Sequence, residues 1–108
     1  MQNIKTTLPH SLLMDRYILI LEAAKEDPLR DHQRLSNKNL LWMCKEIQKM
    51  EKEWPGDKTG RWCGFIQGVM AMKNLIYVDE ERELSRPVFH KYYKDTKTNI
   101  PETLSRDN

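Results

Sequence analysis

One uncharged stretch of eleven residues decides the fold: Trp62-Cys63-Gly64-Phe65-Ile66-Gln67-Gly68-Val69-Met70-Ala71-Met72. Because a helix turns by about 100° per residue, the large apolar side chains of this stretch fall on one broad helical face. They are Trp62, Phe65, Ile66, Val69, Met72 and, just beyond the stretch, Ile76. The pattern predicts a central helix from about Lys58 to Leu75, capped by Asp57, on which the rest of the chain packs.

Three of the four glycines lie on an adjoining face of this helix, at the regular spacing Gly60, Gly64 and Gly68. A glycine inside a helix costs about 1 kcal/mol relative to alanine, so a row of three needs a reason. Such a row leaves a groove in which a second backbone can approach closely. We interpret the groove first as the place where the first or second helix packs. An interface between copies of the chain, or contact with a ligand, is the alternative.

Two helices are predicted before the central one. Apolar residues recur at helical spacing from Ser11 to Lys25, and Asp27-Pro28 ends this segment because the residue before proline leaves the α region. Ser36 supplies an N-cap for a second helix, from about Asn37 to Trp54, which stops at Pro55-Gly56.

The C-terminal part is predicted to hold one or two short helices. One begins at Asp79, and Pro87 is expected to break or kink it, with Ser85 capping a further piece. The fold class is therefore all-α, a small bundle of three main helices plus these short ones. Residues 1–95 form a single helical domain, and residues 96–108 are expected to be a flexible tail.

Composition limits the function. The net charge of +2 comes from 18 basic and 16 acidic residues, which gives no overall preference for nucleic acid or membranes. No segment approaches the roughly 20 apolar residues of a membrane span, so we expect a cytoplasmic protein. Cys44 and Cys63 occupy apolar helical positions and are expected to be reduced core thiols.

A basic face carrying a tryptophan is the main candidate binding surface. On the second predicted helix, Trp42 falls among lysines on the side expected to face solvent. An aromatic ring framed by cations suits an anionic or planar partner. The candidate partner-binding residues are Arg30, Arg34, Lys38, Trp42, Lys45 and Lys49. The alternative is a solvated lysine face, with Trp42 packed under a neighbouring segment.

Catalytic and metal-binding patterns are absent from the sequence. His10, His32 and His90 show no ligand spacing with one another or with the cysteines. The helical glycines follow no strand, so they do not form a phosphate-binding loop, and no serine sits in a nucleophile elbow. We therefore expect a protein that is not an enzyme and needs neither a metal nor another cofactor.

Several segments resemble a family of short proteins encoded by bacteriophages and prophages. They are Pro28-Leu29-Arg30-Asp31-His32-Gln33, Leu35-Ser36, the stretch from Arg61 to Val69 with its RWxGFIQG pattern, Asp79-Glu80-Glu81-Arg82 and Arg86-Pro87-Val88-Phe89-His90. The resemblance implies a phage accessory protein that acts in the bacterial cytoplasm. It implies that the chain, alone or as a homo-oligomer, binds and inhibits or redirects a host protein, for example one of a defence system. The alternative is a nucleic-acid or nucleotide-binding protein, including a nucleotide sponge, that uses the basic face.

Overall fold

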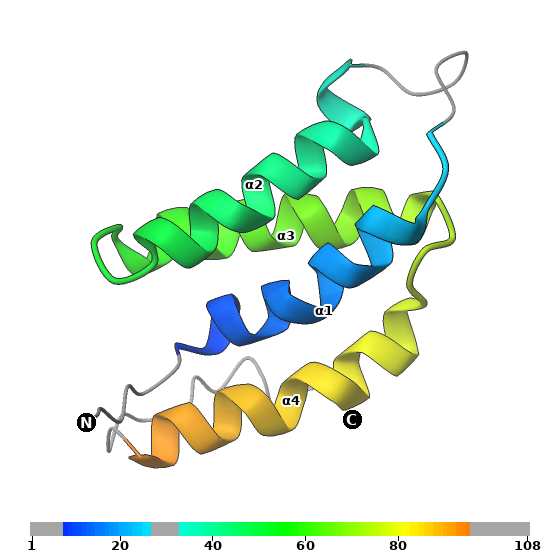
Figure 1. The fold of residues 1–108 in the computed structure, drawn as a ribbon. Coiled ribbons are helices and arrows are strands. Elements are labelled where there is room, and N and C mark those ends of the chain that lie inside the picture. The colour runs from blue at the N-terminus through cyan, green and yellow to red at the C-terminus, as the bar shows by residue number, and fades with distance from the viewer. Residues whose placement is uncertain (1–7, 27–32, 96–108) are drawn as a thin grey trace, which may run out of the picture.

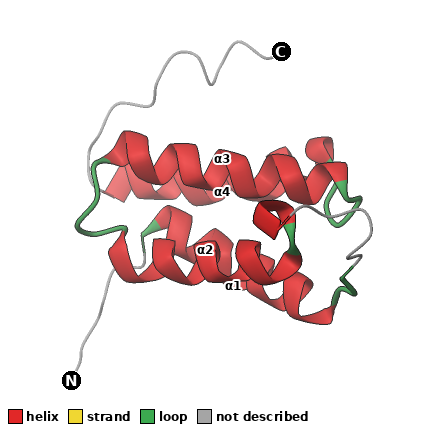
Figure 2. Cartoon of the chain, turned by 90° about the horizontal axis from the view of Figure 1, so that it is seen from above, coloured by secondary structure: helices red, strands yellow, loops and turns green. Residues whose placement is uncertain are grey.

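The computed structural model describes residues 8–26 and 33–95, and there the chain is an all-α globule of four helices. They are α1 (Pro9–Ala23), α2 (Asn37–Met50), α3 (Gly56–Met72) and α4 (Val78–Asp95), with a short 3-10 helix, η1 (Gln33–Leu35), before α2. Successive helices run in opposite directions (Figure 1). Seen from above, α1 and α2 share one layer, and α3 and α4 share the other (Figure 2). The predicted fold class is confirmed.

The predicted start of α2 is also confirmed. The Ser36 hydroxyl accepts a hydrogen bond from the Asn39 backbone N–H at 3.0 Å, as an N-cap does. The predicted cap of α3 is wrong, because this helix begins at Gly56 with Pro55 as its N-cap residue. Asp57 lies in the first turn instead, where it pairs with the Arg61 guanidinium at 2.8 Å.

The C-terminal part forms one long helix rather than one or two short ones. Pro87 lies inside α4, and Ser85 caps no separate piece. A proline inside a helix leaves the carbonyl four residues earlier without its N–H donor. That residue is Glu83, which is exposed like Pro87, so water can serve the carbonyl and the helix continues. The predicted tail, residues 96–108, lies outside the described residues.

The core forms where α1, α2 and α3 meet. Its buried apolar residues are Leu13, Met14, Tyr17, Leu21, Leu40, Cys44, Ile47, Cys63, Ile66, Val69, Met70 and Ile76. Both cysteines are free, and burial raises the pKa of each thiol to about 12, with nearby carboxylates adding to the effect at Cys63. They are therefore protonated core side chains, as the sequence predicts.

The buried face of α3 is rotated from the predicted one. Ile66 and Val69 are buried as expected, but Phe65 is 40% exposed and Met72 is 63% exposed. Their places in the core are taken by Thr59, Cys63 and Met70. The stretch from Trp62 to Met72 has no charged side chain that fixes which way this part of α3 faces.

The glycine row does not receive another helix. Gly60, Gly64 and Gly68 are all exposed, and a Cβ atom built on each would meet no described atom within 4 Å beyond the local helix backbone. The prediction that α1 or α2 packs in the groove is therefore wrong. The alternatives, an interface between copies of the chain or a ligand contact, stay predictions.

Replacing Gly68 by alanine is expected to raise the free energy of unfolding by about 1 kcal/mol, because the new methyl group meets open space and the helix loses less entropy on folding. Urea unfolding followed by far-ultraviolet circular dichroism measures this. If the alanine variant is instead less stable, or a dimer of the wild type dissociates on substitution, a second molecule covers this face.

Two glutamates from other parts of the chain cap α1 and α2. Leu8, before α1, offers no capping side chain, and the Glu51 carboxylate takes its place. Glu51 accepts hydrogen bonds from the backbone N–H of His10 at 3.1 Å and of Ser11 at 2.6 Å. Glu26 accepts from the first two N–H groups of α2, those of Asn37 and Lys38, both at 2.9 Å. Each helix start therefore depends on tertiary structure.

A buried polar cluster joins α4 to α1 and α3. The Glu81 carboxylate, only 4% exposed, accepts hydrogen bonds from the Arg16 guanidinium and from the Tyr17 hydroxyl. Gln67 of α3 donates to the same hydroxyl at 2.8 Å. Burial raises the pKa of Tyr17 above its ordinary value and the bond to Glu81 raises it further, so the hydroxyl stays a donor. The cluster fixes where α4 lies along α1.

Candidate functional site

Trp42 lies on the outer side of α2 and is 53% exposed. Its ring meets that of Trp62 on α3 at 5.8 Å between centroids, and Trp62 meets Trp54 at 4.7 Å. The Lys58 ammonium lies 4.2 Å from the centre of the Trp54 ring. We call Trp42, Trp62 and Trp54 the tryptophan row. Because the Trp62 ring packs against it, the Trp42 ring offers a large aromatic surface in a defined position.

A pocket of about 480 Å³ opens beside Trp42, between α2 and α3. We call it the Trp42 pocket; its lining residues are Arg34, Asn39, Trp42, Met43, Arg61, Trp62 and Phe65. Three aromatic rings and a thioether make it largely apolar, and two guanidinium groups supply positive charge. Asn39 is fixed by its amide, which donates to the Arg34 carbonyl at 2.7 Å.

The structure brings together part of the predicted basic face. Trp42 and Arg34 line the same pocket. Lys38, Lys45 and Lys49 are exposed on the same side of α2, within two turns of Trp42, but they do not line the pocket. Arg30 lies outside the described residues. The lysines are therefore placed to act on the surroundings of a bound partner rather than on a group inside the pocket.

Five residues of this site were not predicted: Asn39 and Met43 from α2, and Arg61, Trp62 and Phe65 from α3. The sequence pattern assigned Trp62 and Phe65 to the core, and the rotation of α3 brings them to the surface beside Trp42. Arg61 could have indicated which side of α3 faces solvent, because it is a cation that directly precedes the uncharged stretch. Its side chain is 67% exposed and pairs with Asp57 along the helix.

The arrangement suits binding. An indole with one free face can stack on a flat or apolar group, and guanidinium groups bind carboxylates or phosphates in a forked geometry.

Within residues 8–26 and 33–95, no group of three or more His, Cys, Asp or Glu side chains could hold a metal ion. No helix in this part of the chain is long and apolar enough to span a membrane. In comparisons with known proteins, no family model, no curated protein and no solved structure matches this chain.

Proposed function

We propose that the protein is a non-enzymatic binding protein that recognises another protein through the Trp42 pocket. The single observation that carries the proposal is a half-exposed tryptophan, held by Trp62, beside a pocket flanked by Arg34 and Arg61. Tryptophan and arginine are the residues that most often dominate the energy of protein interfaces. Because Trp42 is already positioned, it loses little conformational freedom on binding.

The surface around the pocket supports a protein as the partner. Phe65 and Met72 lie two turns apart on the same side of α3, and both are exposed. They continue the apolar surface along α3 beyond the Trp42 pocket. Lys38, Lys45 and Lys49 border it on α2. The complementary surface would carry an apolar anchor surrounded by carboxylates.

Together with the resemblance to phage-encoded proteins, this surface supports a phage accessory protein that binds and inhibits or redirects a protein of the host cell. The partner's apolar anchor would enter the Trp42 pocket, and its acidic residues would meet the arginines and lysines. A second copy of the chain could be accommodated at the exposed face of α3, which the Gly68 variant tests.

Replacing Trp42 by alanine is expected to weaken partner binding at least about tenfold, since a central interface tryptophan commonly contributes 2 kcal/mol or more. Affinity capture from bacterial lysate identifies the partner, and titration calorimetry with the purified partner gives the loss. The matched control is Leu19→Ala, which removes an exposed apolar side chain from α1, outside the pocket. Equal binding by the two variants would mean that the Trp42 pocket is not the recognition site.

The two arginines beside Trp42 also favour a second candidate, a nucleotide or nucleic-acid ligand with its base on the indole and its phosphates on Arg34 and Arg61. Salt separates the candidates. Nucleic-acid binding through about 6–10 phosphate contacts falls about 10³–10⁵-fold between 50 and 200 mM salt. A nucleotide held by two arginines makes too few contacts for that, and is recognised instead by its ultraviolet absorbance in the captured material. Binding through apolar anchors to a protein should fall by less than about tenfold, and the captured material would be resistant to nuclease.

A further inference from the structure

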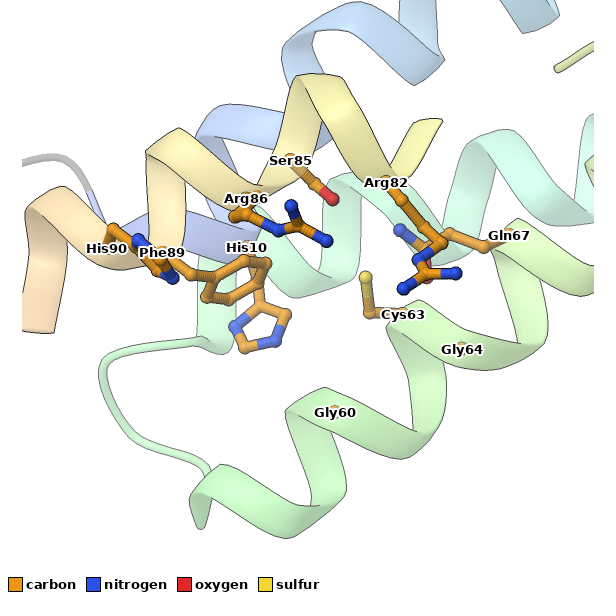
Figure 3. A pocket seen from close by; sticks show the side chains of 10 residues that line it. All are labelled: His10, Gly60, Cys63, Gly64, Gln67, Arg82, Ser85, Arg86, Phe89 and His90. Carbon is orange, nitrogen blue, oxygen red and sulfur yellow. The ribbon is translucent and has the colours of Figure 1, made fainter. Parts of the chain in front are cut away.

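A second cleft lies between α3 and α4, away from the Trp42 pocket, and has a volume of about 470 Å³. Figure 3 shows it, with α4 presenting Arg82, Ser85 and Arg86 and α3 presenting Gly60 and Gly64. It exists because α4 packs mainly on α1, where Glu81 anchors it, rather than on α3. Its volume is within the range of sites for small organic molecules.

The side chains that line this cleft carry cationic groups and no carboxylate. Arg82 and Arg86 are one helical turn apart, with about 5–6 Å between their Cβ atoms, and the Ser85 hydroxyl lies between them in sequence. His10 and His90 also line the cleft. Two guanidinium forks and a hydroxyl offer several donors to one anionic group, and phosphate oxygens accept such forked hydrogen bonds.

The opposite wall is flat. Gly60 and Gly64 bring only backbone to the cleft, and a Cβ atom on either would meet no described atom within 4 Å beyond the local helix backbone. The missing side chains leave room for a planar group to lie along α3. Two of the three glycines of the row thus face a cavity, which gives the row a use other than helix packing.

The end of the cleft is held in place by an aromatic pair. Phe89 meets the His10 ring edge to face, with centroids 5.0 Å apart. The ionised Glu51 carboxylate can only accept, so His10 donates its Nδ1–H to it, at 2.8 Å. Since both rings are fixed by contacts within the protein, the apolar end of the cleft is formed before any ligand enters.

From this geometry we infer that the α3–α4 cleft binds a small aromatic phosphate, with its phosphate on Arg82, Arg86 and Ser85 and its ring between Phe89 and the glycine wall. A phosphate offers three terminal oxygens to the two guanidinium groups and the hydroxyl, more than the two oxygens of a carboxylate. The site is separate from the Trp42 pocket, with which it shares no lining residue.

The amide signals of the α3 glycines test this inference directly, because two of these glycines line the cleft and one does not. On titration of the ¹⁵N-labelled protein with phenyl phosphate, the amide signals of Gly60 and Gly64 are expected to shift and saturate. The signal of Gly68, which does not line the cleft, should move little. Phenol and inorganic phosphate, the two halves of the probe, should each bind more weakly, and benzoate should also bind more weakly.

Charge-removing variants locate the anion. Arg82→Gln and Arg86→Gln should each weaken phenyl phosphate binding about tenfold or more, as expected for the loss of a charged hydrogen-bond donor. Lys25→Gln removes a positive charge from an exposed side chain that lines neither pocket, and should leave this affinity unchanged. Gly64→Leu should fill the cleft and abolish binding while the circular dichroism spectrum stays that of the wild type.

Several outcomes would overturn the inference. They are absence of shifts at Gly60 and Gly64 at millimolar phenyl phosphate, equal shifts at Gly68, or unchanged affinity in both Arg82→Gln and Arg86→Gln. Tighter binding of benzoate than of phenyl phosphate would overturn the assignment to phosphate. None of these results depends on the partner of the Trp42 pocket, so the two proposals fail separately.

Discussion

Replacing Glu81 by alanine is expected to lower the free energy of unfolding by about 3 kcal/mol, because a buried hydroxyl and a partly exposed guanidinium lose a charged acceptor. The Glu81 carboxylate accepts from Arg16 and from the buried Tyr17 hydroxyl, and alanine leaves both donors without this acceptor. Chemical denaturation followed by circular dichroism measures the loss. Because these bonds join α4 to α1, amide hydrogen exchange should accelerate most in α4.

The control for this prediction is Glu80→Ala, a neighbouring carboxylate that is exposed, which should change stability by less than about 0.5 kcal/mol. Tyr17→Phe removes only the hydroxyl and should cost about 1–3 kcal/mol. If the Glu81 and Tyr17 losses simply add in the double variant, the two side chains are not coupled and the cluster does not act as a unit.

Replacing Glu51 by alanine is expected to lower the free energy of unfolding by about 3 kcal/mol near neutral pH. The substitution removes the cap of α1 together with charged hydrogen bonds from the side chains of His10, at 2.8 Å, and Ser11, at 2.7 Å. Glu53→Ala is the control, since Glu53 lies in the same turn but is exposed. A loss no larger than that of the control would show that α1 does not depend on Glu51.

The stabilisation from Glu51 should also depend on pH. Burial by itself would raise the pKa of Glu51, but the hydrogen bonds from His10 and Ser11 outweigh it and hold the pKa below its ordinary value of 4.5. A carboxylate with a lowered pKa stabilises the fold above its unfolded pKa, and the contribution is lost as pH falls through the folded pKa. The stability difference between wild type and Glu51→Gln should therefore shrink steadily below about pH 4.5, and a difference that stays constant through acid would contradict this.

The parts of the fold that rest on local patterns could be predicted from the sequence. Ser36 caps α2 as expected, because its hydroxyl acts on a residue three positions away. Leu40, Cys44 and Ile47 are buried at the spacing that indicates an amphipathic helix. The four-helix, all-α architecture follows from such patterns together with the turn residues between them.

The caps from distant residues could not be predicted. The spacing of Glu51 and Glu26 in the sequence does not indicate which helix each of them caps. Glu51, for example, is about forty positions from His10 and Ser11. Local spacing instead predicted a cap at Asp57, where the structure has none. Sequence spacing can therefore predict only those caps that come from residues next to the helix start.

Only a small part of the candidate site could be predicted, namely Arg34 and Trp42. Trp42 was identified because a tryptophan among lysines breaks the amphipathic pattern of α2. Arg61 and Phe65 were not, because the uncharged stretch of α3, with glycines on one side and large apolar residues on the other, allows more than one rotation against the core. The rotation is decided by the packing of Cys63 and Met70, which local periodicity does not distinguish from that of Phe65 and Met72.

The tryptophan row has a spectroscopic consequence. All three indoles of the protein belong to it, and Trp42 and Trp62 line the Trp42 pocket, whereas no tryptophan lines the α3–α4 cleft. Trp54 shares a hollow with His10 and Phe89, which also form the aromatic end of the cleft. The intrinsic fluorescence of the wild-type protein therefore responds to ligands at either site, and the glycine amides of the cleft show in the same sample which site a ligand occupies.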